Sequence, residues 1–262
     1  MKLDYYLIDP TGNMTILVET PVPAASQPFC ASALLAAEPA AEQAGFLSPG
    51  DADCDRALRM AGGEFCGNAA MSAAALFCDQ AGRTGEVRVR VSGAAAPVRV
   101  EIGGSPEGGY TGAVEMPRPA AVEMVSLTAE GRSFRLPLVR YDGISHLILR
   151  EPLEKAFAER AVKRWCAELG ADGLGLMLPG ETAGTLTPLV YVPCGDTLYW
   201  EHSCASGTAA VGAYLAETGE KAVDLCYAEP GGNLGVSAIP GGAVILRGGI
   251  KILRRSRLEI TP

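Results

Sequence analysis

One segment of the chain reads Cys66-Gly67-Asn68-Ala69-Ala70-Met71-Ser72-Ala73-Ala74-Ala75-Leu76, and another, 138 positions further on, reads Cys204-Ala205-Ser206-Gly207-Thr208-Ala209-Ala210-Val211-Gly212-Ala213-Tyr214-Leu215. Alanine-rich runs of this kind have a high helix propensity. A helix that is apolar on every side is expected to be buried. We therefore predict two buried helices, each beginning beside its cysteine and ending near a glycine, Gly82 in the first case and Gly219 in the second.

The similarity between the two halves of the chain extends beyond these segments. The same offset relates Gly93 to Gly231 and Val98 to Val236, and each pair lies at or within a predicted strand. Residues 87–91 alternate valine with arginine, which is typical of a half-buried strand. A looser match relates residues 15–18 to residues 147–149. The repeat predicts an α/β (α+β) fold of two similar halves that face each other.

A run rich in glycine and proline, residues 103–119, marks the expected boundary between the halves. We predict an N-terminal lobe over residues 1–115 that carries Cys66, and a C-terminal lobe over residues 116–262 that carries Cys204. Whether the final strand packs back on the first lobe is left open.

The composition is that of a globular protein. The 262 residues are 48% hydrophobic and 20% charged, which argues against a disordered chain. A formal net charge of −8 without a basic cluster argues against a nucleic-acid partner. No apolar run is long enough to span a bilayer, and the first residues lack a signal-peptide pattern. We therefore expect no membrane partner and a cytoplasmic location.

The eight cysteines are too few for a disulfide scaffold in a chain of this length, and none belongs to a Cys-x-x-Cys pair. This spacing argues against zinc and thioredoxin chemistry, so no metal is expected. The ordinary interpretation of such cysteines is that they are small, mostly buried side chains with reduced thiols. We apply it to Cys30, Cys54, Cys78, Cys166, Cys194 and Cys226.

Cys66 and Cys204 call for a second interpretation, because each is predicted to stand at the first turn of a matched helix. The unpaired N–H groups of a first turn favour negative charge, whether on a thiolate or on a bound carboxylate. If both helices point at one cleft, one thiolate could remove an α-proton while the other thiol protonates the opposite face. The helix N–H groups would stabilise the carbanion formed in between.

The residues around both cysteines resemble a known superfamily. Residues 63–69 and 200–208 are similar to the two signatures of the diaminopimelate epimerase-like superfamily. Residues 9–18, 42–46 and 188–193 resemble more closely its cofactor-independent histidine racemases, which supply D-histidine to opine-type metallophore synthesis. The resemblance runs through most of the chain. It implies two pseudo-symmetric lobes, each a curved mixed sheet wrapped around a central helix, in a homodimer.

The activity implied by the resemblance is cofactor-independent racemisation of an amino acid, with conversion of L-histidine to D-histidine as the expected reaction. Cys66 and Cys204 would be the two bases. Three further residues match positions with catalytic roles: Glu42, His146 (the histidine that accompanies the first cysteine) and Glu201 (the carboxylate beside the second cysteine). The implied substrate-binding residues are Asn13, Gln43, Gly67, Asn68, His202, Ala205 and Ser206, of which Gly67, Asn68, Ala205 and Ser206 would bind the α-carboxylate through backbone amides.

Two departures from the epimerase pattern bear on the substrate. His202 stands where the epimerases have an arginine, and Ile144 stands where they have an asparagine. A second zwitterionic end of a substrate would lose its partners there, at a cost of about 1–3 kcal/mol for each unpaired buried group. Diaminopimelate is therefore disfavoured, and a smaller or aromatic side chain such as imidazole fits better.

Two alternatives stay open at this point. The same fold could racemise or epimerise another amino acid, as proline-type racemases do with a similar thiol pair. A different class would be a redox or metal-binding protein that uses the two thiols, although only two histidines are available as further ligands.

Overall fold

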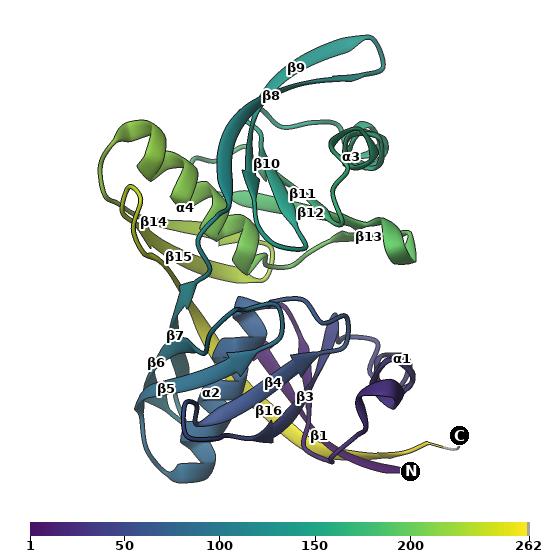
Figure 1. Ribbon diagram of the computed structural model, residues 1–262, viewed down its shortest axis with the longest axis vertical. Coiled ribbons are helices and arrows are strands. Elements are labelled where there is room, and N and C mark those ends of the chain that lie inside the picture. Colours follow the sequence, from purple (N-terminus) through teal and green to yellow (C-terminus); the bar gives the residue numbers. More distant parts are fainter. Residues whose placement is uncertain (261–262) are drawn as a thin grey trace. The chain divides into compact units, whose positions relative to one another are not determined.

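Two structural units divide the chain in the computed structural model, which describes residues 1–260 (Figure 1). The first unit combines residues Met1–Glu115 with the segment that starts at Arg247, and the second unit is Met116–Leu246. The last strand, β16 (Val244–Glu259), begins in the second unit and continues into the first.

The first unit is a closed sheet of eight strands. Its strands are β1 (Lys2–Pro10), β2 (Thr15–Val18), β3 (Gln43–Pro49), β4 (Arg56–Met60), β5 (Gly85–Val91), β6 (Val98–Ser105), β7 (Gly109–Met116) and β16. Neighbours along the chain are neighbours in the sheet, β16 follows β7, and pairing of β16 with β1 closes the ring. Closure leaves no open edge among these strands.

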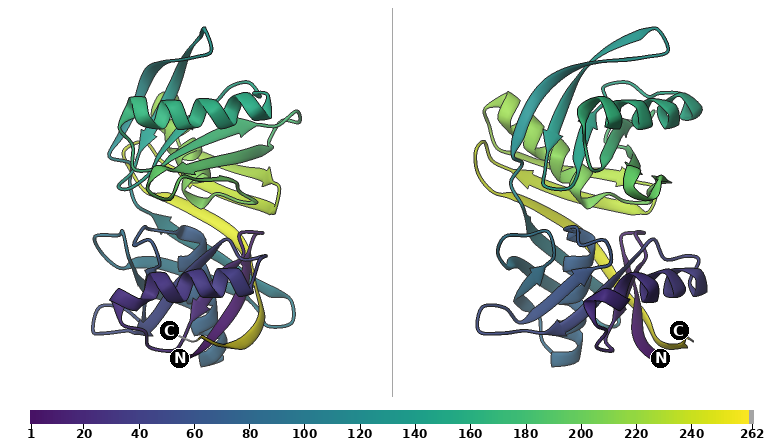
Figure 2. Two further views of the ribbon diagram at one scale, coloured as in Figure 1. Left: turned by 90° about the vertical axis from the view of Figure 1, so that its right-hand side faces the viewer. Right: turned by 45° about the vertical axis from the view of Figure 1, so that its right-hand side comes forward.

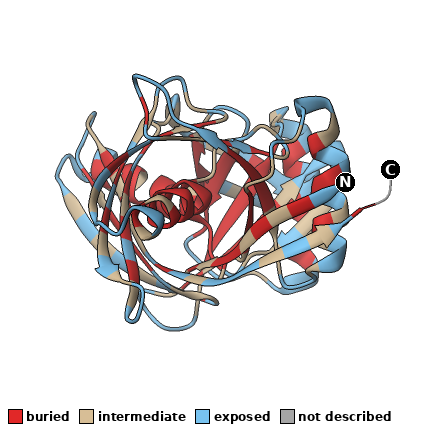
Figure 3. Ribbon diagram, turned by 90° about the horizontal axis from the view of Figure 1, so that it is seen from below, coloured by how far each residue is buried: buried red, intermediate tan, exposed pale blue. Residues whose placement is uncertain are grey.

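Helix α2 (Gly67–Ala81) is the predicted buried helix of this unit. It contacts β1, β2, β4, β5 and β6, and eleven of its fifteen residues are buried. Figure 3 shows a buried helix enclosed by strands. Gly82 ends the helix in the left-handed conformation, as predicted. The outer helix α1 (Gln27–Ala37), which follows a 3₁₀ turn (Ala24–Ser26), packs on β3.

The second unit has a six-stranded sheet with a helix on each face. The sheet order is β13 (Thr197–Trp200), β12 (Leu186–Val192), β11 (Leu174–Pro179), β10 (Ser145–Ile148), β9 (Arg132–Arg140) and β8 (Ala121–Ala129). Helix α3 (Lys155–Leu169) lies across one face (Figure 2). On the other face, α4 (Ala205–Gly219) contacts β9, β10 and β11 together with the hairpin β14 (Val223–Glu229) and β15 (Gly232–Ala238). A second 3₁₀ turn, Pro193–Gly195, precedes β13.

The two units repeat one plan, which confirms the predicted two-lobed fold with a central helix in each lobe. Helices α2 and α4 have the same length and are related by the offset of 138, and so are strands β5 and β14. In each unit the outer helix connects two parallel strands, α1 between β2 and β3, and α3 between β10 and β11.

The structure corrects two details of the predicted repeat. Val87 pairs with Val100 and its counterpart Leu225 pairs with Val236, so Val100 and not Val98 corresponds to Val236. The connection between β5 and β6 is longer than that between β14 and β15, which shifts the offset. Gly219 is still helical, and Glu220 adopts the left-handed conformation that ends α4.

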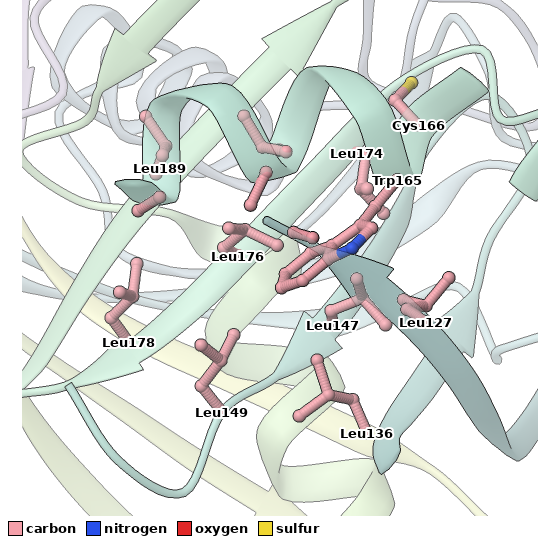
Figure 4. Close-up of a cluster of buried hydrophobic side chains, with 14 of the residues drawn as sticks. Leu127, Leu136, Leu147, Leu149, Trp165, Cys166, Leu174, Leu176, Leu178 and Leu189 are labelled. Atoms are coloured by element: carbon pink, nitrogen blue, oxygen red, sulfur yellow. The ribbon is translucent and has the colours of Figure 1, made fainter. Parts of the chain in front are cut away.

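A leucine-rich core lies between α3 and the six-stranded sheet (Figure 4). Trp165 is fully buried at its centre, its indole N–H donates to the carbonyl of Thr128 over 3.1 Å, and the ring of Phe134 meets it edge-on at 5.1 Å. Alternation along β10 and the residue after it gives this core Leu147 and Leu149. Ile148 points to the opposite face, toward α4.

Among the helices of residues 1–260, none combines the length and the apolar character needed to cross a bilayer.

Replacing Trp165 by alanine is expected to lower the free energy of unfolding by about 3–5 kcal/mol, because it opens a large cavity and unpairs the Thr128 carbonyl. Urea denaturation followed by circular dichroism measures the loss. Tyr199, whose side chain is 55% exposed, provides the control, and Tyr199→Ala should change stability by about 0.5 kcal/mol or less. Equal effects of the two substitutions would contradict this account of the core.

Candidate active site

Cys66 caps the N-terminus of α2 in the first unit. Its backbone is extended (φ −131°, ψ 114°), its carbonyl accepts the N–H of Ala70, and its sulfur accepts the N–H of Ala69 over 3.4 Å. The thiol is half-buried, whereas Gly67 and Asn68 after it are buried. A backbone N–H aimed at sulfur and the positive end of a helix both favour the thiolate.

A turn from the following strand holds the backbone before each cysteine. In the first unit the hydroxyl of Ser92 donates to the carbonyl of Glu64 over 2.9 Å, and Gly93 (φ 75°) packs so closely that a Cβ there would lie 2.3 Å from the nitrogen of Phe65. In the second unit the N–H of Gly231 donates to the carbonyl of His202 over 2.7 Å. The predicted correspondence of Gly93 and Gly231 therefore has a common structural use.

Cys204 caps the N-terminus of α4 with similar backbone angles (φ −122°, ψ 100°), but its surroundings differ from those of Cys66. The side chain is 5% exposed and lies among the apolar residues on the face of the six-stranded sheet that α4 covers. Burial raises the pKa of Cys204 well above its usual value, and the hydrogen-bonded carboxylate of Glu201 raises it further. The N–H of Gly207 acts in the opposite direction.

Glu229 is a buried carboxylate beneath Cys204 that the sequence analysis missed. Its Oε2 accepts the backbone N–H of Cys204 over 2.8 Å, and its Oε1 accepts the hydroxyl of Thr208. Burial raises the pKa of Glu229 to about 7, against the effect of both donors. The offset of 138 relates Glu229 to Val91, so an acidic residue in place of an apolar one was the available signal.

His146 lies on β10 and contacts the first turn of α4. Its Nε2 is 2.9 Å from Oγ of Ser206, and the ring is completely buried. The ring lies over Gly175 of β11, where a Cβ would come within 2.3 Å of Nδ1. Burial lowers the pKa of His146 to about 3, so the ring is neutral at ordinary pH.

The tautomer of His146 follows from its contacts. Nδ1 has no hydrogen-bond partner, and burying an unpaired N–H donor costs more free energy than burying an unpaired acceptor nitrogen. We therefore assign the ring hydrogen to Nε2, which donates it to Ser206. The hydroxyl hydrogen of Ser206 is then available to the sulfur of Cys204, 3.7 Å from its oxygen.

Tyr141 is a second residue that the sequence analysis missed. Its ring is 6.2 Å from that of His146, edge to face, and packs against the apolar cluster that contains Cys204. The hydroxyl is buried and has no partner, and burial raises the pKa of Tyr141. A buried hydroxyl beside a cysteine at a helix start is a candidate ligand-binding group.

Asn13, Glu42 and Gln43 form one hydrogen-bonded group in the first unit, at the start of the parallel pair β2 and β3. The amide of Asn13 donates to Glu42 over 2.8 Å. The amide of Gln43 donates to the carbonyl oxygen of Asn13 and to the hydroxyl of Thr15. The structure thus brings together three predicted site residues of this unit and fixes their orientation.

Thr15 and His146 occupy corresponding positions in the two units. Ile16 and Val18 face the outer helix from β2, as Leu147 and Leu149 do from β10 and the residue after it. Thr15 pairs with Gln43 in the way that His146 pairs with Gly175. One plan thus carries different polar groups in the two halves.

In the second unit, the predicted residues His146, Glu201, Ala205 and Ser206 gather around Cys204, whereas the side chain of His202 is exposed. Within residues 1–260, no group of three or more histidine, cysteine, aspartate or glutamate side chains is arranged to hold a metal ion.

The known proteins that this chain is similar to include amino-acid racemases. The family model described as "Histidine racemase CntK N-terminal domain" matches residues 2–246. A histidine racemase of Staphylococcus aureus is 30% identical over 254 residues, covering 90% of this chain and 88% of that protein. One from Fusobacterium nucleatum is 30% identical over 227 residues, covering 81% of each chain. The solved structure of a probable proline racemase from Agrobacterium radiobacter has the same fold, with a TM-score of 0.73 at 15% identity over 99% of this chain and 94% of that one.

The ring of His146 is expected to stay neutral in the folded protein between about pH 5 and 8, where an ordinary histidine titrates. Its contribution to stability is complete above about pH 6.5. It is lost as the pH falls toward about 3, because only the unfolded chain then binds the proton. Long-range ¹⁵N–¹H spectra of histidine-labelled protein report the protonation state of both histidines.

Gly175→Ala should shift the signals of His146, because the added methyl group displaces the ring from Ser206. Gly249→Ala is the matched control, since a Cβ at Gly249 meets no atom within 4 Å. Titration of both histidines near pH 6.5 in the folded protein would contradict the burial of His146.

Proposed function

We propose that this chain, which belongs to the histidine racemase family and is an amino-acid racemase, interconverts L- and D-histidine by proton transfer between Cys66 and Cys204. One observation carries this proposal. Each cysteine is the N-cap of the central helix of its unit, at equivalent positions of one repeated plan. Two thiols placed in this way suit a reaction that needs one acid and one base.

The proposed reaction balances without a further reagent. One cysteine, as thiolate, takes the hydrogen from Cα of histidine and becomes a thiol. The electron pair of the broken C–H bond delocalises into the α-carboxylate of the planar intermediate. The other cysteine gives its S–H hydrogen to the opposite face of Cα and becomes a thiolate. Racemisation in the reverse direction uses the same two sulfur atoms with their roles exchanged.

Backbone amides at the two helix starts are proposed to bind the substrate carboxylate. Gly67 and Asn68 follow Cys66, and Ala205 and Ser206 follow Cys204, so small or short side chains leave the N–H groups approachable. First-turn N–H groups have no acceptor within their own helix. Negative charge that builds on the carboxylate in the transition state would strengthen these bonds, which accelerates the reaction.

The other predicted site residues are proposed to orient the two cysteines and the substrate. His146 holds Ser206 and stays neutral, which suits a positioning residue better than a base. Glu201 is hydrogen-bonded to Cys204 and keeps the proton on the thiol of Cys204. Glu42 fixes the orientation of Asn13, and Asn13 in turn fixes that of Gln43. We assign the side-chain amides of Asn13 and Gln43, together with His202, to substrate binding.

Histidine is the proposed substrate because two relatives named histidine racemase cover most of this chain. The proposal requires neither pyridoxal phosphate nor a metal ion. A homodimer in the reducing cytoplasm that supplies D-histidine for a metallophore is consistent with the family resemblance and completes the proposal.

Purified protein in D₂O is expected to exchange the Cα hydrogen of L-histidine for deuterium and to form D-histidine without added cofactor. ¹H NMR follows the exchange and chiral chromatography the enantiomers. Cys66→Ser and Cys204→Ser should each slow racemisation by about 10²–10⁴-fold, the usual contribution of a positioned acid or base. Serine is itself a good N-cap, so both helices keep their cap.

Cys194→Ser and Cys226→Ser are the matched controls, because both cysteines are exposed. They should racemise histidine at the wild-type rate. Full activity in either Cys66→Ser or Cys204→Ser would overturn the two-thiol mechanism. Exchange in another L-amino acid, but not in histidine, would overturn the substrate and keep the reaction class.

A further inference from the structure

The carboxylate of Glu229 contacts the start of α4 at two points. It accepts the backbone N–H of Cys204 over 2.8 Å with one oxygen and the hydroxyl of Thr208 with the other. The residue is 6% exposed, at the end of β14. A buried carboxylate with two hydrogen bonds is held in one position, so its charge acts on Cys204 from a fixed direction.

The corresponding strand position of the first unit carries no carboxylate. Val91 takes the place of Glu229 at the end of β5, and Ala70 takes the place of Thr208 on α2. The helix N–H groups act alike in the two units, because the N–H of Ala69 donates to the sulfur of Cys66 and that of Gly207 lowers the pKa of Cys204. The carboxylate at the end of β14 is therefore the feature that the corresponding strand of the first unit lacks.

We propose that Glu229 is a positioning residue that favours the thiol form of Cys204 in the resting enzyme, so that Cys204 is the proton donor and Cys66 the base of the turnover that starts from this state. The opposite direction starts from the state that this turnover leaves, with Cys204 as thiolate and Cys66 as thiol. This inference rests on the proposed two-thiol racemisation and adds the assignment of the two starting states. Negative charge near a sulfur opposes a second negative charge there, whereas a backbone N–H aimed at sulfur supports one. The fixed carboxylate thus breaks the symmetry of the repeated plan.

The titratable groups around Cys204 come from several elements. Glu201 precedes α4, and Tyr214 lies on α4. Tyr141 and His146 belong to β10 and the turn before it, and Tyr227 and Glu229 belong to β14. Strands β11 and β15 contribute no titratable side chain. His146 stays neutral, and burial raises the pKa of Tyr141 and Tyr227. Among these groups, Glu201 and Glu229 raise the pKa of Cys204, and Glu229 carries its charge above its own pKa of about 7.

Glu229→Gln is the sharpest test, because glutamine preserves both contacts. Its carbonyl oxygen can accept the N–H of Cys204, and its amide can donate to the oxygen of Thr208. Only the charge is lost. The rate of alkylation of Cys204 by iodoacetamide, measured by peptide mass spectrometry across a pH series, gives the midpoint at which the thiol becomes a thiolate.

The midpoint for Cys204 should fall by about one pH unit in Glu229→Gln, since a fixed charge close to an ionising group in a protein has an effect of this order. The alkaline limb of the pH profile of kcat/KM for histidine should move down with it, and the acid limb should stay in place. Thr208→Val should shift the midpoint in the same direction by less, because it removes a donor that keeps Glu229 ionised.

Glu217→Gln is the matched control. Glu217 lies at the other end of α4, is exposed, and accepts the N–H of Gly241. Its midpoint for Cys204 should equal that of the wild type. A purely structural role of Glu229 would change the alkylation rate at every pH and leave the midpoint in place, which overturns the proposal. A shifted midpoint in a protein that does not racemise histidine would overturn the proposed function alone, because alkylation requires no turnover.

Discussion

The start of a buried helix is the constraint on which the rest of this structure depends. The first N–H groups of any helix lack acceptors within the helix, and a helix surrounded by strands cannot turn all of them to water. Both α2 and α4 are mostly buried and both begin at a cysteine. The residues of each first turn have small or short side chains. What such a place holds best is a negatively charged group, either a sulfur or a carboxylate.

The two units use one backbone plan and differ in the polar groups around it. Thr15 and Gln43 of the first unit correspond to His146 and Gly175 of the second. Because residue 175 is a glycine, it leaves the space that the imidazole ring of His146 fills. Similarly, the carboxylate of Glu229 stands at the strand position that Val91 occupies. A fold made by repetition can therefore give two cysteines different environments while the central helix and its cysteine cap stay the same.

Much of the fold could be predicted from the sequence, because alanine-rich runs and alternating valines depend on local rules. The central helices, their cysteine caps and the alternation of β5 are confirmed. The correspondence of Val98 and Val236 was wrong, because the length of a turn cannot be inferred from the strands on either side of it. The contacts of Tyr141 and Glu229 were missed for a different reason. Each residue lies far along the chain from Cys204, and only the register of β10 and β14 brings it close.

The path of β16 has a consequence for how the protein is made. Residues 116–246 form one unit within the chain, whereas the ring of strands in the first unit is completed only when β16 pairs with β1. The N-terminal ammonium also donates to the carbonyl of Ile260. When only residues 1–115 have been synthesised, the sheet of the first unit therefore lacks β16 and has two unpaired edges. The inserted unit has its whole sequence available first, so the N-terminal unit is the last to close.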